Sequence, residues 1–133
     1  MKFKFYEYEK CSTCIKARKW MDAKGIAYER VAIREQPPTC PELMQLLASH
    51  DGNLKKLFNT SGADYRDPAI KNLLPNLSVE ETLDLLSKRG NLIKRPVLIG
   101  ENFAIQGFKP DLWEEALGQK NLPTLIPNDI ECR

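Results

Sequence analysis

Hydrophobic and polar residues alternate at the beginning of the chain, where lysine and phenylalanine take turns within residues 2–8. A period of two is typical of a strand with one buried face, so this segment is predicted to be a β-strand. The period then becomes that of a helix: over residues 12–24, Cys14, Ala17 and Met21 fall on one face. The opposite face of this predicted helix carries Lys16, Arg18, Lys19, Asp22 and Lys24.

The middle of the chain is predicted to be mainly helical. Gly25 is positioned to end the first helix, and residues 27–33, which contain several β-forming side chains, predict a second strand. Two capping boxes, Thr39–Glu42 and Ser78–Glu81, then predict the starts of two further helices. A shorter helix is predicted between them, over residues 68–74.

Strand signals return towards the end of the chain. Residues 97–99 predict a buried strand, Glu101-Asn102 a hairpin turn and residues 103–106 the returning strand. A last helix is predicted over residues 110–117. The order β-α-β, helical block, β-β-α predicts an α/β protein with a small mixed four-stranded sheet flanked by helices, which is the thioredoxin-type order.

The length of 133 residues fits one domain, which we place at residues 1–118, with a helical insertion at about 35–92 and a tail at 119–133. The net charge is +2 and basic and acidic residues are interleaved, so neither nucleic acid nor a membrane is expected as a direct partner. The N-terminal segment lacks the apolar core of a signal peptide, and no apolar run reaches the ~20 residues of a membrane span. A cytoplasmic location is therefore expected.

The most informative motif is Cys11-Ser12-Thr13-Cys14, which lies between the first predicted strand and the first predicted helix. Two cysteines at this spacing are typical of thiol–disulfide exchange. The helix start would direct backbone N–H groups and the positive end of the helix dipole at Cys11, which lowers a thiol pKa. Cys14 lies one turn further on and faces the core, where it either resolves a mixed disulfide or simply packs.

A zinc site is the alternative interpretation of the two cysteines. Structural zinc usually has four ligands in two closely spaced pairs, whereas the remaining candidates, Cys40, His50 and Cys132, are scattered singly. We therefore expect no metal site. His50 is predicted to be a C-terminal residue of its helix.

Several short motifs occur together in order, and in this combination the chain resembles the arsenate reductase (ArsC)/Spx family over residues 3–117. It is most similar to the uncharacterised ArsC-related members. The motifs are Cys11–Cys14 followed by a basic helix, Phe58–Gly62, Tyr65-Arg66, Ile93–Pro96 and Gly107–Lys109.

The resemblance implies a thioredoxin-like fold with a helical insertion, a reactive Cys11 and a cis peptide bond before Pro96. In the arsenate reductases of this family the reactive cysteine attacks arsenate while three arginines hold the oxyanion. Arg95 matches one of these arginines, whereas Asn59 and Lys109 stand where the other two would be. Arginine offers a bidentate fork to an oxyanion, which neither lysine nor asparagine reproduces.

Two functions follow from the resemblance. The first is a thiol-based oxidoreductase in which Cys11 attacks, Cys14 resolves and Arg95 supports the anionic partner. No bound cofactor is expected, and glutathione, glutaredoxin or thioredoxin would supply the reducing equivalents. The alternative is an Spx-like redox-sensing regulator that binds the RNA polymerase α-subunit.

Overall fold

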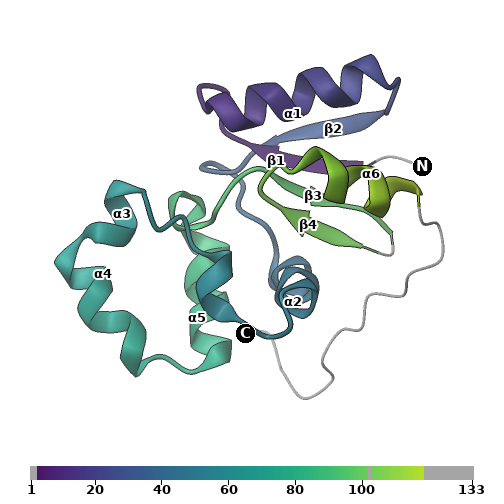
Figure 1. Cartoon of the computed structure of the whole chain (residues 1–133). Helices are drawn as coiled ribbons and strands as arrows, with labels where there is room; N and C mark the ends of the chain where they lie inside the picture. The colour runs from purple at the N-terminus through teal and green to yellow at the C-terminus, as the bar shows by residue number, and fades with distance from the viewer. Residues whose placement is uncertain (1–2, 102, 119–133) are drawn as a thin grey trace.

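A four-stranded mixed sheet forms the centre of the protein, in a computed structural model that describes residues 3–101 and 103–118 (Figure 1). The strand order is β2-β1-β3-β4. β1 runs parallel to β2 and antiparallel to β3, and β3 pairs antiparallel with β4. The strands are β1 (Phe3–Glu7), β2 (Tyr28–Ala32), β3 (Val97–Ile99) and β4 (Ala104–Gln106).

Helices cover both faces of the sheet. Side chains of the strands alternate between these faces, so that Phe5 and Leu98 pack with Cys14 and Trp113 on one side, whereas Tyr6 packs on the other side with the helical block. The first side is covered by α1 (Ser12–Ala23) and α6 (Pro110–Gly118), and the second by α2 (Cys40–Ser49) and α5 (Val79–Lys88).

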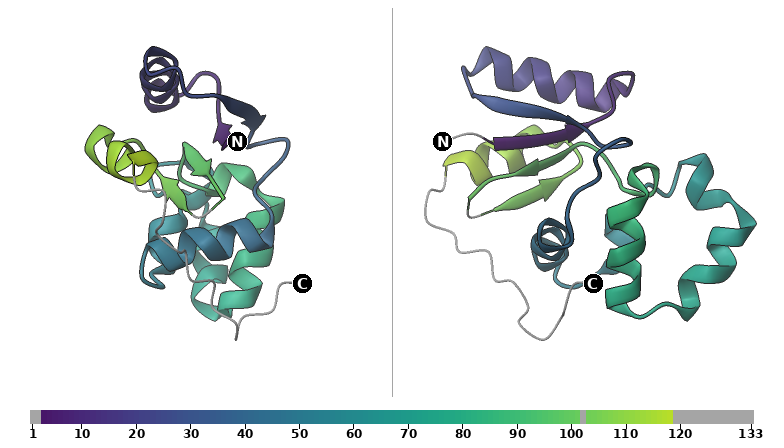
Figure 2. Two further views of the ribbon diagram at one scale, coloured as in Figure 1. Left: turned by 90° about the vertical axis from the view of Figure 1, so that its right-hand side faces the viewer. Right: turned by 180° about the vertical axis from the view of Figure 1, so that it is seen from behind.

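The stretch between β2 and β3 is helical, and it extends beyond one end of the sheet (Figure 2). Both predicted capping boxes are present: Thr39 and Ser78 accept hydrogen bonds from the backbone N–H groups of Glu42 and Glu81. The short elements are η1 (Leu54–Leu57), α3 (Ala63–Arg66), α4 (Pro68–Leu73), η2 (Leu74–Asn76) and η3 (Gly90–Leu92).

Gly90 shows how closely this block approaches the sheet. A Cβ atom at this position would lie 1.7 Å from the backbone oxygen of Ile33, just after β2. Only a residue without a side chain allows the two backbones to come so near.

The predicted strands and helices are confirmed to within one or two residues at their ends. Gly25 has a φ of 68°, the left-handed conformation expected of a residue that terminates a helix. Asn102 of the predicted hairpin turn and the predicted tail at 119–133 lie outside the described residues. None of the helices in the two described ranges is long and apolar enough to cross a membrane.

Arg18, which lies on the face of α1 opposite Cys14, is not fully exposed. Its Nε lies 3.0 Å from Oε1 of Glu7, the last residue of β1. Glu7 also forms an ion pair with Arg30, whose Nη2 lies 2.9 Å from Oε2 of Glu7. The Glu7 residue is only 5% exposed. The buried carboxylate holds Arg18 because an isolated charge is costly away from water.

Candidate functional site

The junction between β1 and α1 positions the two cysteines. Cys11 is the residue that caps α1: its backbone is extended, with φ −78° and ψ 121°, and its carbonyl oxygen accepts the N–H of Ile15 at 3.0 Å. Ser12 and Thr13 form the first turn, in which backbone N–H groups lack helical acceptors. The side chain of Cys11 therefore stands where a capping oxygen would otherwise be found.

The surroundings of Cys11 favour its thiolate. Partial burial opposes ionisation, but the backbone N–H and thiol of Cys14, a hydrogen bond from the Arg95 side chain and the backbone N–H of Thr13 outweigh it. The net result is a pKa below the usual value for cysteine. Because Cys11 is also partly exposed, it combines the ionisation and the access that a nucleophilic thiol needs.

Cys14 has the opposite character. Its side chain is fully buried in the cluster formed by α1, α6 and the sheet. Burial raises the pKa of its thiol to about 12, and the nearby Cys11 and the charge of Glu7 act in the same direction. The two thiols are thus differentiated: the pKa of Cys11 is lowered and its thiol is accessible, whereas the pKa of Cys14 is raised and its thiol is buried.

Arg95 reaches this site from the loop that precedes β3. The Arg95–Pro96 peptide bond is cis, in agreement with what the family resemblance implies. Arg95 is half-buried, and its guanidinium carbon lies 4.9 Å from the centre of the Tyr8 ring. The guanidinium thereby contacts both the Tyr8 ring and the Cys11 thiol.

A cleft of about 650 Å³ opens beside the start of α1. Thr13, Asn59, Arg95 and Lys109 all contribute to its walls. The structure therefore brings together the predicted binding residues, although they are far apart in sequence. Lys55, Lys56 and Lys94 also line the cleft, and none of its described lining residues is acidic. Cys11 is not itself a lining residue, but Thr13 and Arg95, which line the cleft, both hydrogen-bond to its thiol. Such a cationic wall suits an anionic partner.

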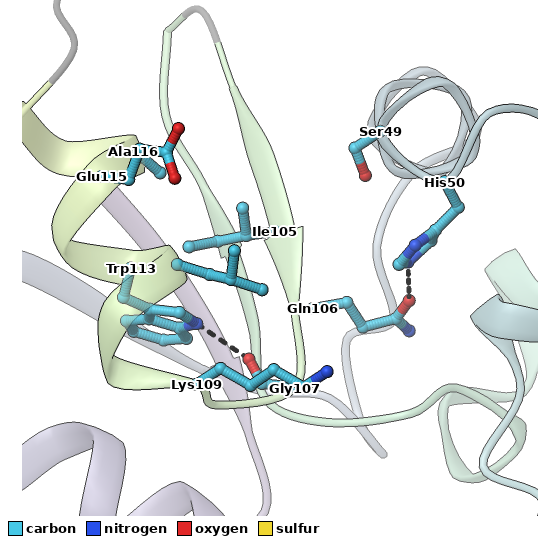
Figure 3. A pocket seen from close by; sticks show the side chains of 10 residues that line it. Ser49, His50, Ile105, Gln106, Gly107, Lys109, Trp113, Glu115 and Ala116 are labelled. Carbon is cyan, nitrogen blue, oxygen red and sulfur yellow. Dashed lines mark hydrogen bonds between the residues drawn. The ribbon is translucent and has the colours of Figure 1, made fainter.

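Gln106 is a structural residue of this site that the sequence patterns did not reveal. Its amide nitrogen donates to the backbone oxygens of Lys94, at 2.8 Å, and Leu57, at 3.0 Å. Its amide oxygen lies 3.0 Å from Nε2 of His50 (Figure 3). One side chain therefore ties the Arg95 loop to η1 and to the end of α2.

His50 is the C-terminal capping residue of α2, as predicted. Burial lowers the pKa of its imidazole, and the charges of Lys56 and Lys94 lower it further. Since the amide nitrogen of Gln106 is used by two carbonyl groups, Nε2 of His50 acts as the donor to its oxygen. His50 thus has a structural partner and is not placed as a base. The described part of the chain contains no cluster of three or more histidine, cysteine or acidic side chains that could hold a metal ion.

A smaller hollow of about 310 Å³ adjoins the cleft between α2, β4 and α6 (Figure 3). Trp113 lies at its edge and donates from its indole nitrogen to the backbone oxygen of Gly107 at 2.8 Å. This bond fixes the turn that carries Lys109 into the cleft.

Fold and site together define a thioredoxin-like protein with a pair of unlike thiols at the start of its first helix. A comparison with known families agrees, because the ArsC family model matches residues 6–116. The chain belongs to the ArsC family.

Its relatives include both uncharacterised proteins and regulators. The chain is 44% identical over 115 residues to the uncharacterized protein YusI of Bacillus subtilis, covering 86% of this chain and 98% of YusI. It is 27% identical over 101 residues to the global transcriptional regulator Spx 1 of Lactococcus lactis, covering 76% of this chain and 77% of that protein.

Solved structures show the same fold. An ArsC family related protein from Bacteroides fragilis superimposes with a TM-score of 0.77 at 40% identity, covering 86% of this chain and 97% of that one. A possible arsenate reductase from Streptococcus mutans superimposes with a TM-score of 0.73 at 39% identity, covering 83% and 96% respectively.

Proposed function

We propose that this protein is a thiol-based oxidoreductase that reduces a disulfide with its Cys11–Cys14 pair. The observation that carries the proposal is the difference between the two thiols. Cys11 is partly exposed, and the helix start and Arg95 favour its thiolate, while Cys14 is buried and protonated one turn away. In a two-step exchange the accessible thiol attacks first as a thiolate, and a second thiol close by can then attack the mixed disulfide that forms.

In the first step the Cys11 thiolate attacks a substrate disulfide. A sulfur–sulfur bond forms between Cys11 and one half of the substrate, and the other half leaves as a thiolate. In the second step Cys14 gives up its proton to solvent and attacks Sγ of Cys11, which releases the remaining half as a thiolate that takes up a proton from solvent. The dithiol is oxidised to a disulfide by two electrons and the substrate is reduced by two. Glutathione, glutaredoxin or thioredoxin would then regenerate the dithiol.

The cleft supports a substrate that carries carboxylates. Arg95, Lys94 and Lys109 line it without an acidic neighbour among the described lining residues. Lysine serves as a point charge and asparagine, at position 59, as a neutral donor, so this set suits the separated carboxylates of a glutathione disulfide better than one tetrahedral oxyanion. We therefore place disulfides above arsenate as substrates.

Turnover measurements test this proposal. Wild type, Cys11→Ser and Cys14→Ser would be compared with oxidised glutathione, an uncharged disulfide and arsenate as substrates, using glutaredoxin- or thioredoxin-linked reduction. We expect glutathione disulfide to be reduced fastest, Cys11→Ser to be inactive, and Cys14→Ser to stop as a mixed disulfide visible by mass spectrometry. Turnover that survives in Cys11→Ser would rule out the mechanism.

A second candidate function is a redox-sensing regulator, which the similarity to Spx 1 supports. In this case the same dithiol would switch the affinity for a protein partner, for which we propose the RNA polymerase α-subunit. Binding of the α-subunit would be measured with reduced and oxidised protein and with Cys14→Ser. Binding that depends on oxidation, without disulfide turnover, would favour the regulator over the enzyme.

A further inference from the structure

Tyr8 lies in the short connection between β1 and Cys11, and its ring contacts two arginines. The guanidinium carbons of Arg95 and Arg34 lie 4.9 Å and 5.0 Å from the ring centre. The carbonyl oxygen of Tyr8 accepts the backbone N–H of Cys11 at 3.0 Å. Tyr8 is thus hydrogen-bonded to the backbone of Cys11, and its ring contacts Arg95, the arginine that acts on the Cys11 sulfur.

Neither Arg34 nor Arg95 forms an ion pair with a carboxylate elsewhere in the described ranges. A long arginine side chain loses conformational entropy when it is held in one place, so a defined position needs a compensating contact. The face of an aromatic ring provides one for a guanidinium. For Arg95 the Tyr8 ring is that contact; within the described residues its guanidinium otherwise interacts with the Cys11 thiol.

The hydroxyl group of Tyr8 contributes nothing visible to this arrangement. It has no hydrogen-bond partner among the residues that the structure describes, in contrast to Tyr6, which donates to Glu42 at 2.6 Å, and Tyr28, which donates to Asp22 at 2.9 Å. The contact with the arginines is therefore made by the Tyr8 ring alone, and a phenylalanine at this position would keep that ring.

We propose that Tyr8 is a positioning residue: its ring holds the Arg95 guanidinium beside Cys11 Sγ and so maintains the thiolate. The inference rests on the proposed function, because it assumes that the Cys11 thiolate is the reacting group. The charged and titratable groups that act on the two sulfurs are Arg95, Glu7 and the cysteines themselves. The backbone of Tyr8 bonds to both cysteines, whereas its ring contacts Arg95 and Arg34.

The pH dependence of Cys11 alkylation tests the inference. The full-length protein would be treated with iodoacetamide between pH 5 and pH 10, and modification of Cys11 would be followed by mass spectrometry of its peptide. The variants are Tyr8→Phe, Tyr8→Leu, Arg95→Met and the double variant Tyr8→Leu/Arg95→Met. Tyr65→Leu is the matched control, because Tyr65 is half-buried against Phe58 and has no contact with a guanidinium in the described structure.

We expect Tyr8→Phe and Tyr65→Leu to keep the wild-type profile. Tyr8→Leu should raise the apparent pKa of Cys11 and slow alkylation at pH 7 by about two- to fivefold, the range of an ordinary cation–π contact. Arg95→Met should shift the profile in the same direction, and the double variant should show no further shift. Tyr8→Gln serves the same purpose if circular dichroism shows that Tyr8→Leu is unfolded.

Three results would overturn the role of Tyr8: an unchanged profile in Tyr8→Leu, an unchanged profile in Arg95→Met, or a double-variant shift equal to the sum of the single shifts. The last would show that the ring and the guanidinium act separately. The proposed function fails differently, because wild-type Cys11 would then ionise like an exposed thiol or Cys11→Ser would retain turnover.

Discussion

Replacing Cys14 with alanine should change the stability of the protein in opposite directions at neutral and alkaline pH. The Cys14 thiol is fully buried, and burial raises its pKa to about 12, whereas a thiol in the unfolded chain ionises near pH ~8.5. A folded-state pKa above the unfolded value contributes stability below pH ~8.5. This contribution is lost as the pH rises from there towards the folded-state pKa.

The size of the effect follows from the two pKa values. Each pKa unit corresponds to about 1.4 kcal/mol, and pH 10 lies about 1.5 units above the unfolded value. Wild type should therefore lose about 2 kcal/mol of unfolding free energy between pH 7 and pH 10 that Cys14→Ala does not lose. At pH 7 the alanine variant should be less stable by about 1 kcal/mol, as for the deletion of one buried methylene-sized group.

Urea unfolding at pH 7 and pH 10, with a non-thiol reductant present, measures this difference. We expect the order of stability to invert, with Cys14→Ala as stable as wild type or more stable at pH 10. Cys11→Ser is the matched control: it keeps the buried thiol and should keep most of the alkaline loss. If wild type and Cys14→Ala differ by the same free energy at both pH values, Cys14 is not held protonated in the core and the difference between the two thiols described above is wrong.

Three further substitutions test the structure around the site. Glu7→Gln should lower the unfolding free energy by about 2–4 kcal/mol, measured in urea at pH 7, because it leaves the half-buried Arg18 without its counter-charge; equal stability would show that the pair contributes nothing. Gln106→Leu should lower it by about 2 kcal/mol because His50 and two backbone oxygens lose a partner, and a loss below about 0.5 kcal/mol would contradict the bridge. Trp113→Phe should lower the melting temperature by several degrees, since a buried hydrogen bond and ring contacts are removed, and scanning calorimetry would detect it.

Local patterns in the sequence were sufficient to predict the four strands and the longer helices, but not the short elements η1, α3, η2 and η3. The period of two near Phe5 and the period of a helix around Cys14 identify β1 and α1. The capping boxes at Thr39 and Ser78 mark helix starts with their own hydrogen bonds. Each of these signals involves residues within a few positions of one another, which is why it can be recognised without a structure.

The site was only partly predictable for the same reason. The spacing of Cys11 and Cys14 was enough to identify them as candidate site residues, and the family motifs indicated Arg95. Gln106, in contrast, contacts His50 across 56 positions of sequence, and nothing in a strand-end glutamine indicates such a bridge. The pairing of Arg18 with Glu7 depended on the burial of that carboxylate, which the helix pattern alone does not contain.

The packing of the thiols has one practical consequence. The chain contains two tryptophans, and both Trp20 and Trp113 belong to the aromatic and aliphatic cluster that encloses Cys14 and adjoins Cys11. Their ring centres are 6.2 Å apart. Closing a bond between the two sulfurs alters the immediate surroundings of both indoles, so the intrinsic fluorescence of the protein should report its oxidation state without any added dye.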